Sequence, residues 1–204
     1  MTDKNTNNLQ IFSRESKPFG KTWEEWTANW WQWLLSIPKG SNPCNDKTGE
    51  NFDKNQNNQN VLFLAGTFGG SAERQITIPS SKAILMPVIN FTTSYAEEPT
   101  LKSESELISR AKSDIDDIVK KVAIVDGVAM SDLDIYRIRS APFDIILPDN
   151  NVIEATPGHT RAVSDGYWVF LQPLAPGKHK ICAIGSCSSG KTKVDVTFNV
   201  TVTE

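Results

Sequence analysis

Cysteine and histidine are scarce in this sequence, which argues against disulfide, metal and nucleophile chemistry. Among 204 residues there are three cysteines and two histidines. The odd count, made by Cys44, Cys182 and Cys187, does not suggest a disulfide framework. We expect reduced thiols, with a Cys182–Cys187 bridge across a hairpin as the alternative. The histidines show no metal-binding spacing such as HExxH, so we expect neither a metal nor a cofactor.

Long apolar runs and targeting signals are missing as well. No stretch of 18 apolar residues occurs, so we expect no helix that spans a membrane. The first ten residues, MTDKNTNNLQ, lack the basic and apolar regions of a secretory signal. These absences predict a cytoplasmic protein without a membrane partner.

Charge of either sign is modest, with a formal net charge of -3. No basic run is interleaved with aromatic residues, so nucleic acid is not an expected partner. The chain is 39% hydrophobic and 22% charged, which is ordinary for a globular protein. We expect a single domain over residues 1–204, with a polar N-terminal arm at 1–20 and a long polar loop at 39–60. Loops of that length are often functional.

Tryptophan is what the sequence has in unusual concentration, because five of its six tryptophans lie in the segment 22–37. Thr22 and Glu25 fit a capping box and Pro38 follows the segment, so we predict a helix there. Its apolar arc is roughly 200° wide, twice what a surface helix needs. We therefore expect cover on two sides, from the rest of the domain or from a partner chain, as in a homo-oligomer. Trp31, on the flank of the main stripe, is the candidate for a binding or interface contact.

Strand patterns dominate the rest of the chain. Strands are predicted at 61–65, 74–78, 83–89, 123–125, 128–130, 135–139, 143–147, 167–171, 178–184 and 194–202. Asp126-Gly127 indicates a two-residue hairpin, and Pro87 indicates an edge strand or bulge. A second, amphipathic helix is predicted over 103–122. The fold class is α+β and mostly β: an antiparallel β-sandwich or barrel-like core with an N-terminal Trp-rich helix and the second helix added.

One segment matches a phosphate-binding loop letter for letter. Gly185, Gly190, Lys191 and Thr192 satisfy GxxxxGK[ST]. Such a loop needs a helix directly behind it, whose N-terminus faces the phosphates. The following residues, KVDVTFNVTV, alternate as a strand does, and the chain ends twelve residues after Thr192. We interpret the segment as a flexible hairpin loop and reject the phosphate site.

Candidates for catalysis are weak. His159 lies in a predicted loop, and Asp149 and Asp165 are acidic residues near it in sequence. A hydrolase-type site near 148–165 would need the fold to bring these three together. Tryptophan also stacks on sugars, so exposed Trp31 or Trp168 would suggest a carbohydrate-binding module.

Three segments resemble a family of uncharacterised bacterial and archaeal proteins: TWEEWTANWWQWLLSIP, FLAGTFGG at 63–70 and GYWVFLQPLAPGKHKI at 166–181. Together they cover about a fifth of the chain. The resemblance implies one intact domain and implies no activity, since no reaction is assigned to that family.

The sequence does not identify a substrate, and the small-molecule ligand stays unknown at this stage. Our leading hypothesis is a non-enzymatic binding or assembly protein, because a wide tryptophan arc occurs without a convincing catalytic set. The loop-borne hydrolase and the carbohydrate-binding module are the alternatives.

Overall fold

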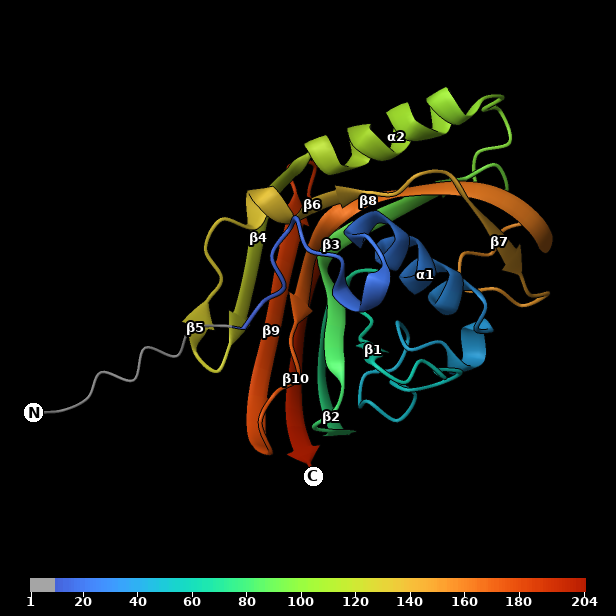
Figure 1. The fold of residues 1–204 in the computed structure, drawn as a ribbon. Coiled ribbons are helices and arrows are strands. Elements are labelled where there is room, and N and C mark those ends of the chain that lie inside the picture. The colour runs from blue at the N-terminus through green and yellow to red at the C-terminus, as the bar shows by residue number, and fades with distance from the viewer. Residues whose placement is uncertain (1–9) are drawn as a thin grey trace, which may run out of the picture.

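The computed structural model describes residues 10–204 and consists of two stacked β-sheets, one of which carries the helices (Figure 1). Sheet 1 has the order β1-β3-β8-β6, and β7 also pairs with β8. Its strands are β1 (Val61–Phe63), β3 (Ala83–Ser94), β6 (Arg137–Arg139), β7 (Phe143–Leu147) and β8 (Gly158–Leu171). Sheet 2 has the order β2-β10-β9-β4-β5. Its strands are β2 (Gly70–Pro79), β4 (Ile118–Val125), β5 (Val128–Ala129), β9 (Gly177–Cys187) and β10 (Lys193–Thr203).

The prediction of a mostly β sandwich with two helices is confirmed. The sheets are mixed, because β1 pairs with β3 and β2 pairs with β10 in parallel, while the other pairings are antiparallel. The described strands do not close into a barrel. The two helices are α1 (Trp23–Leu35) and α2 (Glu104–Asp116), and short 3-10 turns lie at Pro18–Gly20, Lys39–Ser41 and Leu133–Tyr136.

Sheet 1 is the middle layer of the molecule, which explains its continuous apolar runs. On β3, Ile84 and Met86 pack in the cluster between the sheets, whereas Leu85 packs with α1. On β8, Val169 faces sheet 2 and Trp168 faces the helix. Strands buried on both faces have no wet side and hence no polar alternation. By contrast β10, at 193–203, alternates as predicted, with one face in the core.

Helix α1 begins and ends close to where the caps predict. The Thr22 hydroxyl accepts from the Glu25 backbone N–H at 3.3 Å, and the Glu25 carboxylate accepts from the Thr22 N–H at 2.7 Å. All five of its tryptophans are buried, and they pack against β3, β7 and β8 of sheet 1. The chain itself therefore covers the wide apolar arc.

Helix α2 ends earlier than predicted. The pattern indicated a helix over 103–122, but the helix stops at Asp116 and β4 starts at Ile118. Leu107, Ala111 and Ile115 are its buried face, as expected. The apolar residues beyond the helix are β-branched, and two of them, Ile118 and Val122, pair with β9 instead. Residues 118–122 therefore belong to a strand, although their apolar spacing also fits a helix.

Local turn signals were more reliable. Asp126 and Gly127 both have positive φ, 51° and 79°, and they join β4 to β5 as the two-residue hairpin that was predicted. The strand predicted at 135–139 is only three residues long, because a 3-10 turn occupies Leu133–Tyr136. His159, predicted to lie in a loop, belongs to β8.

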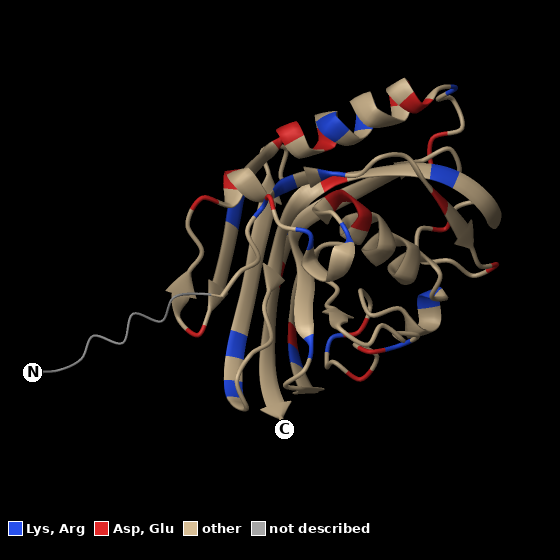
Figure 2. Ribbon diagram, in the orientation of Figure 1, with Lys and Arg blue, Asp and Glu red and all other residues tan. Residues whose placement is uncertain are grey.

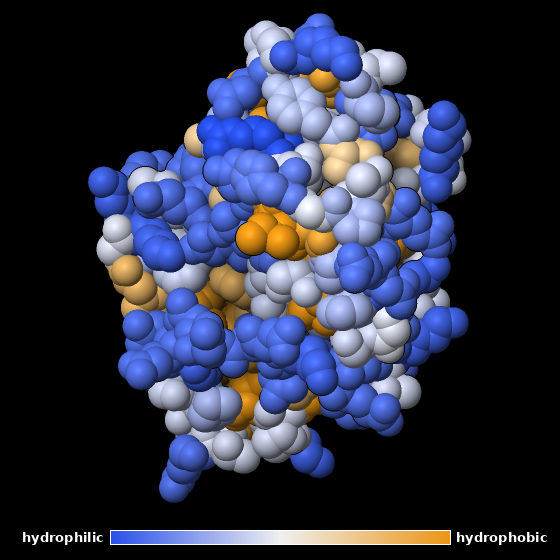
Figure 3. All heavy atoms as spheres, turned by 90° about the vertical axis from the view of Figure 1, so that its right-hand side faces the viewer, coloured by the Kyte–Doolittle hydropathy of each residue, from blue (hydrophilic) through white to orange (hydrophobic). Residues whose placement is uncertain are grey.

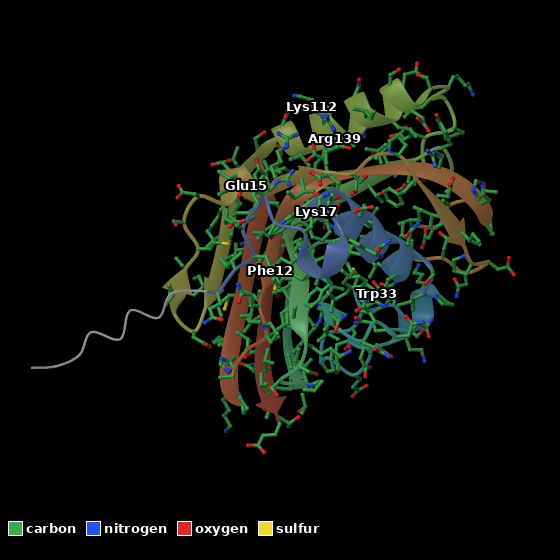
Figure 4. All side chains as sticks on the ribbon, viewed as in Figure 1. Phe12, Glu15, Lys17, Trp33, Lys112 and Arg139 are labelled. Carbon is green, nitrogen blue, oxygen red and sulfur yellow. The ribbon has the colours of Figure 1, made fainter. Side chains whose placement is uncertain are left out.

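Residues 10–22 run along sheet 1 before α1 begins; the rest of the predicted arm, 1–9, lies outside the described residues. The Phe12 N–H donates to the Phe170 carbonyl at 2.9 Å, and the two rings meet edge to face. Trp33 lies on the opposite side of α1 (Figure 4), where its indole N–H donates to the Lys54 carbonyl at 2.7 Å. Indole groups thus attach both the arm and the 39–60 loop to the domain, since Trp23 donates likewise to Ser13.

Charged residues lie along α2 and at strand ends, whereas most of α1 is uncharged (Figure 2). Within residues 10–204, no helix combines the length and the apolar character needed to cross a membrane. All three cysteines are free, and Cys182 and Cys187 lie in the same strand, β9.

Candidate functional site

A cavity of about 420 Å³ lies beside β3, at the point where β1 ends. β1 pairs with β3 only as far as Leu85, so from Met86 onward the described part of the chain gives β3 one strand neighbour, β8. The cavity surrounds this free edge and reaches both faces of the strand. One wall comes from α1 and residues 152–154, and the other comes from β9 and β10.

Pro87 explains how β3 tolerates a free edge. Upstream of it, the Ala83 N–H donates to the Asn60 carbonyl, and the Leu85 carbonyl accepts from Leu64, so the odd-numbered residues face β1. By the same alternation, the backbone of Pro87 faces the side on which β1 has already ended. Because proline has no backbone N–H, no donor is left unpaired at this edge. The register also shifts between Pro87 and Ile89. The predicted edge or bulge at Pro87 is confirmed. Pro87 itself lines the cavity.

Two glycines allow this bulged segment to sit close to its neighbours. A Cβ on Gly185 of β9 would lie 2.6 Å from the Ile89 Cβ, and one on Gly166 of β8 would lie 2.4 Å from the Asn90 Cβ. Any side chain at either position would push β3 away. The glycines therefore maintain the shape of the cavity at its β3 side.

The lining is mostly apolar and aromatic. Trp30, Trp31 and Leu34 come from α1, and Val196 and Phe198 come from β10. Further apolar contacts come from Phe68, Met86, Val88, Ile89, Phe91, Val152, Ile153, Ala183 and Val194. Phe68 is 50% exposed, so it lies at the rim.

Two buried donors in this lining have no hydrogen-bond partner among residues 10–204: the Trp31 Nε1 and the Asn90 Nδ2. Trp31 is only 4% exposed. Leaving a buried donor without a partner costs about 1–3 kcal/mol. By contrast, the neighbouring Trp30 donates to the Leu64 carbonyl at 3.1 Å. Both nitrogens are covered by neighbouring atoms, so an acceptor on a bound molecule would pair with them once the covering side chains move.

Glu97 contributes a carboxylate to the lining. Its carboxylate accepts from the Ser94 hydroxyl at 2.8 Å. Burial raises the pKa of Glu97 to about 7, against the hydrogen bonds from Ser94, and the nearby carboxylates of Glu98 and Asp114 add to the rise. This carboxyl group is consequently poised to change its charge near neutral pH.

A buried arginine supports the wall behind the cavity. Arg74 is 2% exposed, and its guanidinium donates to the carbonyls of Pro43, Asp46, Ala65 and Gly66. Cys44, beside it, lines the cavity, and burial raises the pKa of its thiol to about 12, although Arg74 opposes this. The thiol is therefore neutral and contributes to the wall as a small apolar group.

The residues predicted as catalytic do not converge. His159 is exposed at the start of β8 and contacts Asp144 at 3.1 Å. Asp165 lies six positions along the same strand, about 20 Å away at the usual rise, where it is buried against Arg137 at 2.8 Å. Asp149 is exposed in the β7–β8 connection. The geometric condition for a hydrolytic site at these three residues is not met.

The structure separates the two predicted tryptophan contacts. Trp31 lines the cavity, while Trp168 is fully buried under α1 and does not line it. Neither is exposed, so neither forms the open platform that a sugar would stack on. In the rejected phosphate motif, Gly185 lies inside β9 and Thr192 precedes β10. The predicted strand follows the motif, and the helix that phosphate binding needs is not there.

Sequence reasoning missed Asn90 and Glu97. Asn90 had a faint signal, because it is the first polar residue after the apolar run of β3. Glu97 had none, since its burial depends on the fold. The described residues contain no cluster of three or more histidine, cysteine or acidic groups that could hold a metal.

A search against protein-family models gave no match, and comparisons with curated proteins and with solved structures gave none either. The cavity is therefore interpreted from its own geometry and chemistry.

Proposed function

We propose that the protein is a non-enzymatic binding protein, whose cavity beside β3 takes up a small, mostly apolar molecule that carries a hydrogen-bond acceptor. The observation that supports this most directly is the pair of unpartnered buried donors, on Trp31 and Asn90, in a mostly apolar lining. Ligand sites commonly combine a hydrophobic lining with a few placed polar groups, and their volumes run from about 300 to 1,000 Å³. A cavity of about 420 Å³ lies within that range.

The alternatives have less support. For an assembly function, the tryptophans would have to be offered to a partner, but all six are buried within this chain. The large apolar side chains exposed in residues 10–204 are scattered over different elements: Phe19, Phe68, Val119, Ile135 and Ile146. The face shown in Figure 3 is mostly hydrophilic, with small separate apolar areas. The separation of His159 from Asp165 weighs against the hydrolase.

A neutral fluorescent ketone tests the proposal. Prodan has an apolar naphthalene body and one carbonyl acceptor, and its emission reports the polarity of its surroundings. We expect saturable binding at 1:1 stoichiometry with a blue-shifted emission. Trp31→Phe should weaken binding about 2- to 12-fold, the effect of one lost hydrogen bond of about 0.5–1.5 kcal/mol. Asn90→Leu should weaken it to a similar extent.

Trp168→Phe is the matched control. Trp168 also has a buried indole N–H without a partner among the described residues, but it does not line the cavity. The control should leave prodan binding unchanged. If prodan does not bind, or if Trp168→Phe weakens binding as much as Trp31→Phe does, the proposal is refuted.

A further inference from the structure

The charged residues that line the cavity are both acidic. Two charged residues line it, Glu97 and Glu154, and the lining contains no lysine, arginine or histidine. Glu154 is exposed and forms an ion pair with Lys39. Glu97 is thus the one lining carboxylate whose charge the described residues leave uncompensated by a direct ion pair.

Two other shielded carboxylates of this chain have either a cationic partner or several backbone N–H donors. Asp165 is paired with Arg137 at 2.8 Å, and the Asp46 carboxylate accepts three backbone N–H groups. Within residues 10–204, the Glu97 carboxylate is hydrogen-bonded by Ser94 alone, and the charged groups that act on it, Glu98 and Asp114, are acidic as well. Arg110 forms ion pairs with both of those neighbours, Glu98 and Asp114.

We propose that the cavity selects organic amines, with Glu97 as the partner of the ligand's ammonium group and the apolar walls as the contact for its carbon skeleton. This inference rests on the proposed function, and it specifies the class of ligand. Shielding a carboxylate from water without a cationic partner costs free energy. An ammonium group on the ligand would replace the hydrogen bonds and the favourable charge interaction that water otherwise provides. Trp30, Trp31 and Phe91 add ring faces that attract cations. An oxygen on the same ligand would accept from Trp31 or Asn90.

Amine binding is then coupled to a proton. The ammonium requires ionised Glu97, and the pKa of Glu97 in the free protein is about 7. The ionised fraction rises from about a tenth at pH 6 to about nine tenths at pH 8. Apparent amine affinity should therefore increase about tenfold over this interval, with a proton released on binding at the acidic end.

Three probes with one phenol head separate the terminal groups by charge: tyramine, tyrosol and 4-hydroxyphenylacetate end in an ammonium, a hydroxyl and a carboxylate. We expect calorimetry on the full chain at pH 8 to show tyramine binding about tenfold or more tighter than tyrosol, the effect of a charge-assisted hydrogen bond. The carboxylate should bind most weakly. Glu97→Gln should abolish both the preference for tyramine over tyrosol and its pH dependence.

Glu154→Gln is the control, because it removes the other lining carboxylate, and it should keep the ranking. Equal affinities for tyramine and tyrosol, or a preference that survives Glu97→Gln, would overturn the amine inference and leave the binding function standing. If none of the three probes binds and prodan does not bind either, both the inference and the proposed function fail.

Discussion

Arg74 offers the sharpest test of how the fold supports the cavity. Its guanidinium is buried and holds four carbonyl groups from two separate segments, 43–46 and 65–66. Replacing it with methionine keeps much of the volume but leaves these acceptors without their donor. Hydrogen bonds to charged groups are worth about 1.5–3 kcal/mol each and are not additive. A buried acceptor that loses its donor adds a cost of about 1–3 kcal/mol.

We therefore expect Arg74→Met to lower the free energy of unfolding by about 4 kcal/mol, which is a large part of the stability of a typical domain. For a chain of this length that corresponds to a fall in Tm of roughly 8–16 °C. Urea unfolding followed by tryptophan fluorescence measures the change. Arg74→Lys should recover only part of it, because an ammonium cannot reproduce the planar fork of donors.

Arg139→Met is the control, since Arg139 is exposed on a short strand and a surface change should stay within about 0.5 kcal/mol. Hydrogen exchange should show faster exchange at 43–49 and 64–67 in Arg74→Met, before global unfolding. A loss of stability below about 1 kcal/mol would refute the reasoning that this cation holds the two segments together.

Two further predictions concern pH and packing. Burial lowers the pKa of His179, but the Asp126 carboxylate, 2.7 Å from its Nδ1, and a backbone carbonyl outweigh this effect, so the pKa is raised overall. The His179–Asp126 pair therefore stabilises the fold below pH 6.5. This stabilisation is lost as the pH rises through the folded-state pKa of His179. His179→Gln should flatten that part of the urea-midpoint profile between pH 5.5 and 8.5, and an unchanged profile would contradict the assignment. Gly185→Ala should lower the free energy of unfolding by about 1–3 kcal/mol, because the new Cβ would lie 2.6 Å from the Ile89 Cβ. Thermal denaturation measures this change. Gly40→Ala is the control and should be nearly neutral, since a Cβ there would have nothing within 4 Å.

Local signals predicted the elements that depend on neighbours in sequence. The capping box of α1 and the Asp126-Gly127 hairpin were predicted and are present. These features depend on backbone conformation and short-range hydrogen bonds, which a few adjacent residues determine. The end of α2 was wrong, because residues 118–122 satisfy both a helical spacing and a strand, and pairing with β9 decided between them.

The candidate site shows the same division. Trp31 was singled out because it lies off the main stripe of α1, and the structure places it at the cavity. Asn90 and Glu97 could not be found in that way. Whether a donor has a partner, or a carboxylate has a cation, depends on residues that are distant in sequence and become neighbours only in the folded chain.

The sequence by itself determined the fold class, the tryptophan-rich helix, most strands and the strand that follows the GxxxxGK[ST] segment. It did so because periodicity and turn chemistry act over a few residues. The tertiary structure alone decided that β1 stops at Phe63 and leaves an edge of β3 open, that α1 and β10 enclose this edge, and that Glu97 lies there without a cation. A cavity is the space between segments, so its existence and its charge are properties of packing and not of any one segment.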